Sequence, residues 1–276
     1  MTTKSLLPFL VCSILLLTNC KKKKEENIPA PNSDNNKSKP MPINEITMGS
    51  SLGSEYANRV LLGHSYSRGF ISSVDGPPGS LTTVDFTIDF VGMFLFDGNS
   101  TGLNAGTVTV NDSLLPWSEN KKYYHNDYEL VPAPPFNYNL LNQVKIKATG
   151  SASISTFDLA IMKPLCDTIS LEEPKIEYER AKGIQIKFNQ PITGADSAHV
   201  YISTSNKLLQ EKATRKLVPY GSTTITFSAA ELNGLYADSS ASLSINAFKN
   251  HFPADIATRK THVLGVRSSH YLIILK

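Results

Sequence analysis

The most regular feature of this sequence is the alternation of apolar and polar positions after Pro42. Residues 83–96 place Val84, Phe86 and Ile88 two positions apart, with Thr and Asp between them. A period of two residues is typical of a β-strand with one buried face, so we expect these three side chains to face a core. The same period predicts further strands at residues 106–110, 143–147, 153–161, 184–188, 199–203, 223–227, 243–248 and 269–275.

Turn-forming residues separate these segments, and the strongest turn signal is the Asp-Gly-Pro-Pro-Gly sequence at residues 75–79. A capping box at Ser228 predicts a helical turn or two, but no window of ten or more residues carries the helical period. The chain is therefore expected to be all-β. Because the alternation stops at Pro164 and restarts after Pro174, it predicts two antiparallel, immunoglobulin-like β-sandwich domains, at residues 44–165 and 172–276.

The N-terminal segment has the pattern of an export signal. A positive start is followed by an apolar run at residues 6–17, which is too short to span a bilayer. The run ends in Leu17-Thr18-Asn19-Cys20, which resembles the lipobox of bacterial lipoproteins although Asn19 replaces the usual smaller residue. The resemblance implies that residues 1–19 are a signal peptide and that Cys20 is acylated, which would anchor the protein to a membrane.

The residues after Cys20 predict a tether at 20–43. Its second part is rich in Pro, Asn, Ser and Lys and has too few apolar groups to form a core. No Asp follows Cys20, so the lipoprotein pattern implies the outer membrane, at its periplasmic face or at the cell surface. The four Lys and two Glu at residues 21–26 resemble a charged surface-export tag, and they fit a solvated spacer equally well.

Composition excludes some partner classes. The first 40 residues hold seven of the 27 basic residues and three of the 24 acidic ones, so the remainder has a net charge of −1. A folded part without a basic excess argues against nucleic acid as a partner. Cys166 is the only cysteine after Cys20, which excludes a disulfide within the mature chain, and we expect it to be a buried apolar residue.

Two groups of segments resemble uncharacterised bacterial cell-envelope lipoproteins built from β-sandwich repeats. The first group is residues 105–114, Ala-Gly-Thr-Val-Thr-Val-Asn-Asp-Ser-Leu, followed by paired tyrosines and by residues 145–150. The second group is residues 226–232 and 242–245. The resemblance covers most of residues 83–276 and implies sandwich modules, but it brings no catalytic residue.

Catalytic and metal-binding patterns are weak. Residues 63–67, Gly-His-Ser-Tyr-Ser, resemble a nucleophile elbow centred on Ser65, but Ser67 stands where the elbow needs glycine and no helical pattern follows. A hydrolase that uses Ser65 is thus the alternative function. The six histidines have no zinc-type spacing, and we expect neither a metal nor a cofactor.

The strongest binding signal is a cluster of aromatic residues between two predicted strands. Trp117, Tyr123, Tyr124 and Tyr128 lie within twelve positions, among polar residues and prolines. Such rings contribute large contact areas when exposed, and they pack a core when buried. The sequence therefore predicts a non-catalytic surface lipoprotein that binds a glycan, a peptide or another envelope protein, with these four residues as the candidate site.

Overall fold

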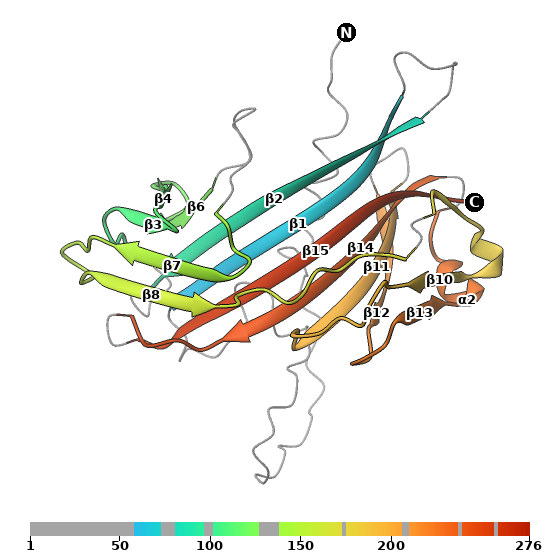
Figure 1. Ribbon diagram of the computed structural model, residues 1–276. Coiled ribbons are helices and arrows are strands. Elements are labelled where there is room, and N and C mark those ends of the chain that lie inside the picture. Colours follow the sequence, from blue (N-terminus) through green and yellow to red (C-terminus); the bar gives the residue numbers. More distant parts are fainter. Residues whose placement is uncertain are drawn as a thin grey trace, which may run out of the picture. The chain divides into compact units, whose positions relative to one another are not determined.

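The computed structural model describes residues 58–72, 81–96, 102–126, 138–172, 175–205, 210–236, 239–256 and 259–276. Tyr56–Lys276 forms one compact unit, and nearly all of its described secondary structure is β (Figure 1). The predictions for the signal peptide, Cys20 and the tether lie outside the described residues. No helix in the described part of the chain is long and apolar enough to cross a membrane.

One large sheet contains most of the described strands (Figure 1). Its order is β12-β11-β14-β15-β1-β2-β6-β5, and the short strand β9 also pairs with β15. Along the long central strands, successive side chains point to opposite faces of this sheet. We call the face towards two smaller sheets the inner face, and the opposite one the outer face. The strands are β12 (Glu211–Leu217), β11 (Ser197–Ser205), β14 (Ser239–His251), β15 (Thr261–Leu275), β1 (Asn58–Ser72), β2 (Leu81–Leu95), β6 (Tyr123–His125), β5 (Trp117–Ser118) and β9 (Glu177–Tyr178).

The large sheet joins the two halves of the chain. β1, near the start of the described residues, pairs in parallel with β15 at the C-terminus, from Asn58 opposite Thr261 to Arg68 opposite Tyr271. The strands assigned to 44–165 and 172–276 therefore share one sheet, whereas the sequence predicted two separate antiparallel ones. The pairing satisfies backbone groups along one side of β15 that would otherwise form a sheet edge.

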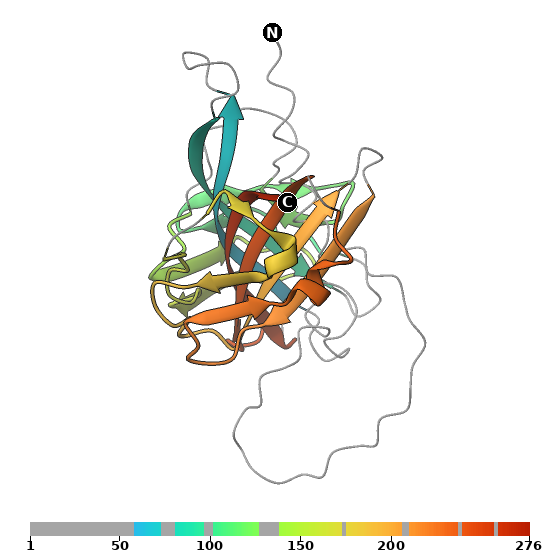
Figure 2. The ribbon, with the colours of Figure 1, turned by 90° about the vertical axis from the view of Figure 1, so that its right-hand side faces the viewer.

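Two smaller sheets lie on the inner face and enclose two hydrophobic cores (Figures 1 and 2). The first core lies beneath a four-stranded sheet and contains Val60, Met93 and Ile146. The second lies beneath a two-stranded sheet and contains Ile245 and Phe227. The four strands are β4 (Ser113–Leu115), β3 (Val108–Val110), β7 (Gln143–Ala148) and β8 (Phe157–Met162), and the two are β10 (Ile184–Lys187) and β13 (Thr224–Phe227).

Two short helical segments complete the second half. The expected helical turn is present as α2 (Ala229–Leu232), and η2 (Arg180–Lys182) is a 3₁₀ turn. In α2 the Ser228 hydroxyl accepts from the Glu231 backbone N–H, and the Glu231 carboxylate accepts from the Ser228 backbone N–H. These bonds confirm the predicted capping box, and Leu232 anchors the turn in the second core.

The break in alternation that starts at Pro164 falls in a connection, residues 163–172, that crosses the inner face between the two cores. Lys249 Nζ donates to the Lys163 carbonyl at 2.8 Å, and Ser269 Oγ donates to the Ile169 carbonyl at 2.9 Å. A β-carbon built on Gly265 would lie 1.8 Å from the Pro164 carbonyl oxygen, so this crossing requires glycine on β15. Burial raises the pKa of the Cys166 thiol to about 11, which disfavours the reactive thiolate.

The outer face carries a buried histidine, His199 on β11. Its ring lies near Tyr201 and Phe248, with ring centroids 6.1 and 6.4 Å away. Only 8% of the residue is exposed, and neither ring nitrogen has a hydrogen-bond partner in the structure described. Burial, aided by the positive charge of Arg215, lowers the pKa of His199 to about 4.

We predict that His199 makes the fold sensitive to acid. Its folded pKa lies below the unfolded value of about 6.5, so the unfolded state binds protons first as the pH falls from about 6.5 towards 4. Protonation of this residue in the unfolded state should lower the free energy of unfolding by about 2 kcal/mol at pH 5 relative to pH 7.5. Urea denaturation of His199→Phe at both pH values should show a correspondingly smaller loss of stability between pH 7.5 and pH 5. Leu217→Phe, at the exposed cross-strand neighbour, should keep the full loss; equal losses in the two variants would refute the assignment.

Candidate functional site

The structure places Ser65 in the middle of a continuous strand. β1 runs from Asn58 to Ser72, and Ser65 is opposite Ile88 on β2 and Ser268 on β15. Its side chain lies on the outer face, while that of His64 lies on the inner face. A nucleophile elbow needs a tight turn between a strand and a helix. The geometry at Ser65 therefore does not support the alternative hydrolase.

The four aromatic candidates do not form one surface. Tyr124 is 1% exposed and belongs to the first core, where its hydroxyl accepts from the Ala105 N–H at 2.6 Å. Trp117 is half-buried against the same core. Tyr123 lies on the outer face against Phe94, with ring centroids 4.3 Å apart. Tyr128 lies outside the described residues.

Tyr124 is therefore a core residue, contrary to the expectation that it belongs to a binding surface. Alternation along β6 (Tyr123–His125) directs adjacent tyrosines to opposite faces, so Tyr123 and Tyr124 cannot face one partner together. The small sheets cover only the inner face, so the inward ring of Tyr124 becomes part of the core.

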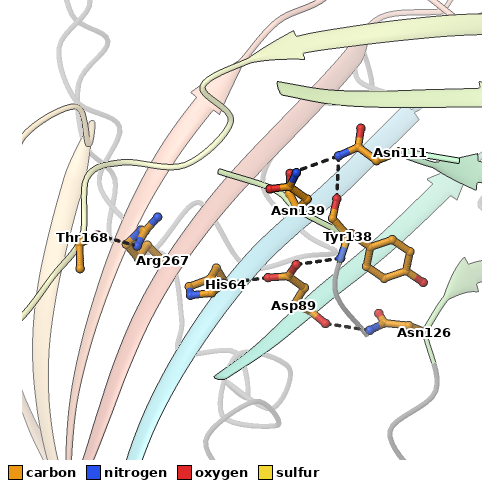
Figure 3. A network of polar contacts seen from close by, with 8 residues as sticks. All are labelled: His64, Asp89, Asn111, Asn126, Tyr138, Asn139, Thr168 and Arg267. Atoms are coloured by element: carbon orange, nitrogen blue, oxygen red, sulfur yellow. Dashed lines mark hydrogen bonds and ion pairs between the residues drawn. The ribbon is translucent and has the colours of Figure 1, made fainter. Parts of the chain in front are cut away.

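A different group of residues comes together on the inner face. Asp89 on β2 is opposite His64 on β1, which in turn is opposite Arg267 on β15. Figure 3 shows the His64 ring between Arg267 and Asp89. We call these three residues the polar row; it lies where the first core gives way to the second.

Asp89 orients the histidine of the polar row. Its carboxylate contacts His64 Nδ1 at 2.8 Å and accepts from the Tyr138 backbone N–H at 2.9 Å. Burial, together with the negative charge of Asp89, raises the pKa of Tyr138 to about 12. Asn126 donates to the Asp89 carbonyl, and Asn111 donates to the Tyr138 carbonyl at 2.6 Å (Figure 3). These bonds fix the position of the carboxylate, so the second nitrogen of His64 points away from it.

Arg267 is the buried cation of the polar row. Only 8% of the residue is exposed, and burial lowers the pKa of its guanidinium. The one hydrogen bond that its guanidinium forms within the described residues runs from Nη1 to Thr168 Oγ1 at 3.2 Å (Figure 3). Its Nε has no partner in that part of the chain. A buried charge with so few partners is costly, and a functional role is one explanation for its presence.

A pocket of about 400 Å³ opens beside the polar row. This volume lies in the range of small-molecule sites, roughly 300–1,000 Å³. Arg68 and Asp85 form a two-pronged ion pair at its rim, with both nitrogen–oxygen distances 2.8 Å. Tyr66 and Tyr271 meet edge to face there, with ring centroids 5.9 Å apart. The remaining lining residues are His64, Thr87, Leu141, Thr168–Leu171 and Arg267–Ser269.

The pocket lining combines a carboxylate-held histidine with several hydroxyl groups. A histidine held by a carboxylate acts as a general base in many enzymes, where it takes a proton from a reacting group or from a water molecule. Among the described lining residues, the Ser269 hydroxyl donates to the Ile169 carbonyl and the Thr168 hydroxyl accepts from Arg267. No group of three or more His, Cys, Asp or Glu residues able to hold a metal ion occurs in the described part of the chain.

A change of phase along β2 is the sequence signal that would have indicated this site. Val84 and Phe86, which alternation assigned to a buried face, are 38% and 39% exposed on the outer face. Further along the strand, Val91 and Met93 are buried in the first core. From Thr83 to Asp89 the apolar residues occupy only even positions, and from Val91 onward they occupy odd positions as well, so the first half of β2 turns its polar side chains inward.

No model of a known protein family matches the chain, and the search of curated proteins found no similar protein. A function for this protein must therefore be inferred from its own residues.

Proposed function

We propose that this protein is a lipid-anchored envelope protein whose folded part is a non-catalytic binding module. Acylated Cys20 would hold it on the outer membrane, at the periplasmic face or the cell surface, and the tether would separate the module from the lipid. Its partner would be a glycan, a peptide or another envelope protein. The immunoglobulin-like sandwich description belongs to this proposal too, since the shared sheet and one smaller sheet enclose each core.

The observation that supports a binding role is the polar row beside an open pocket. Asp89 and Arg267 are buried at 5% and 8% exposure, at positions between two apolar cores. Apolar side chains there would join the cores without the cost of removing charges from water. Charged residues retained beside a pocket of small-molecule size indicate ligand binding.

The binding role can be tested by filling the pocket. The full chain, purified in detergent from envelopes, is denatured, and any retained ligand is identified by mass spectrometry. Thr87→Trp places a large ring at an exposed lining position and should abolish retention. Thr83→Trp, on the same face of β2 but outside the pocket lining, should leave retention unchanged. A wild-type chain that retains no ligand, or equal retention in both variants, would overturn the proposal.

The anchor makes a separate prediction. Cys20→Ala should leave the chain unprocessed or release it from the membrane, because no thiol remains to carry the acyl chains. Fractionation followed by intact-mass measurement would show this. Cys12→Ala, within the same leader, is the control and should be acylated normally. A Cys20→Ala chain that stays in the membrane fraction at the mature mass would rule out the lipoprotein assignment.

A further inference from the structure

We propose that the pocket beside the polar row takes a carboxylate, carried by a compact polar ligand such as a sugar acid, and that Arg267 binds it. This inference rests on the binding role proposed above and specifies the ligand class. It follows from the distribution of charge around the pocket.

Three basic side chains line the pocket, and two already have a carboxylate. Arg68 is paired with Asp85, and His64 with Asp89. Arg267 forms no ion pair within the described residues, although Asp89 and Asp167 lie near enough to stabilise its charge. The pocket therefore has one buried positive charge to which no carboxylate of the described chain is bound.

The geometry of Arg267 favours a planar anion. Thr168 accepts a hydrogen bond from Nη1, which leaves Nε and Nη2, along one edge of the guanidinium, to bind a ligand. Two parallel N–H groups match the two oxygens of a carboxylate, and such paired bonds are among the strongest in proteins. Because Nε is buried, the side chain must turn this edge towards the pocket when the ligand binds, and Nε then gains the acceptor that it lacks.

The rest of the lining suits a small polar body. Tyr66 and Tyr271 contribute aromatic surface, and Thr87 contributes a hydroxyl at an exposed position. Residues 168–171 of the connection also line the pocket, and Ser269 holds this segment through the Ile169 carbonyl. An aromatic wall with scattered polar groups is common where sugar-sized ligands bind.

The test uses calorimetric titration of the full chain with three probes: glucuronate, glucose and inorganic phosphate. Glucuronate should bind at least tenfold more tightly than the other two. Arg267→Gln should weaken glucuronate binding by roughly 10- to 100-fold, because the charged hydrogen bonds are lost. Arg267→Lys, which keeps the charge but not the paired donors, should give an intermediate loss. Arg180→Gln removes a positive charge on η2, outside the pocket lining, and should have no effect.

The outcomes separate this inference from the binding role itself. If Thr87→Trp abolishes ligand retention but Arg267→Gln does not change glucuronate affinity, the pocket binds a ligand and the carboxylate assignment is wrong. Equal affinity for glucose and glucuronate, or tighter binding of phosphate, would also overturn it. Unfolding midpoints of the Arg267 variants near the wild-type value would show that lost affinity is not lost folding.

Discussion

Replacing Gly265 by alanine should destabilise the folded chain by about 3 kcal/mol or more. A β-carbon at Gly265 would lie 1.8 Å from the Pro164 carbonyl oxygen and 2.9 Å from its carbonyl carbon. Backbone atoms cannot rotate away as a flexible side chain can, so either β15 or the connection at residues 163–172 must move. The shift would disturb the hydrogen bond from Lys249 to the Lys163 carbonyl. It would also move the connection away from the two cores between which it crosses.

Urea denaturation would measure this loss, and the chain provides two matched controls. Gly234→Ala meets no atom within 4 Å and should change stability by less than about 0.5 kcal/mol. Gly63→Ala meets the Phe90 ring at 1.8 Å, but that ring can rotate, so its cost should fall between the two. If Gly265→Ala were as stable as Gly234→Ala, the crossing of the connection over β15 would be wrong.

Tyr124→Ala should cost about 3–5 kcal/mol, and Tyr123→Ala about 1 kcal/mol or less. The ring of Tyr124 is fully buried in the first core, so its removal leaves a cavity. Its hydroxyl also lies 2.8 Å from both Asn104 Oδ1 and the Gly106 carbonyl. Tyr123 is half-buried on the outer face, where it contacts Phe94 and His125.

Tyr124→Phe separates the two contributions of that residue. It keeps the ring and removes the hydroxyl, which leaves the buried Ala105 N–H without its acceptor. We expect a loss of about 1–3 kcal/mol by thermal or urea denaturation. Equal losses from Tyr123→Ala and Tyr124→Ala would show that both rings are packed alike, contrary to the opposite faces described for β6.

The sequence was informative wherever the relevant interaction is local. The capping box at Ser228 predicted α2, because its hydrogen bonds join residues three apart. Alternation predicted the strands β7 and β8, whose inward residues Val144 and Ile161 lie in the first core. The break at residues 164–174 did mark a change in structure, the connection between the two cores.

The same local reasoning failed where one strand passes through two different environments. Alternation in β2 predicted that Val84 and Phe86 are buried, because a period of two identifies a face but not which face is covered. Only the positions of the small sheets decide that residues 83–87 extend past their cover, so that Asp85 and Thr87 on the inner face are exposed as well. The assignment of Tyr124 to an exposed loop failed for the same reason.

The sequence by itself determined that the folded part is β-rich, where many of its strands lie, and that it lacks the basic excess typical of nucleic-acid binding. Only the tertiary structure decided that β1 pairs with β15 and that Asp89, His64 and Arg267 form one row. The period of a strand depends on neighbouring residues, so it can be read from the sequence. Pairing between strands some 200 residues apart depends on which backbone edges and apolar faces remain uncovered once the other strands have assembled.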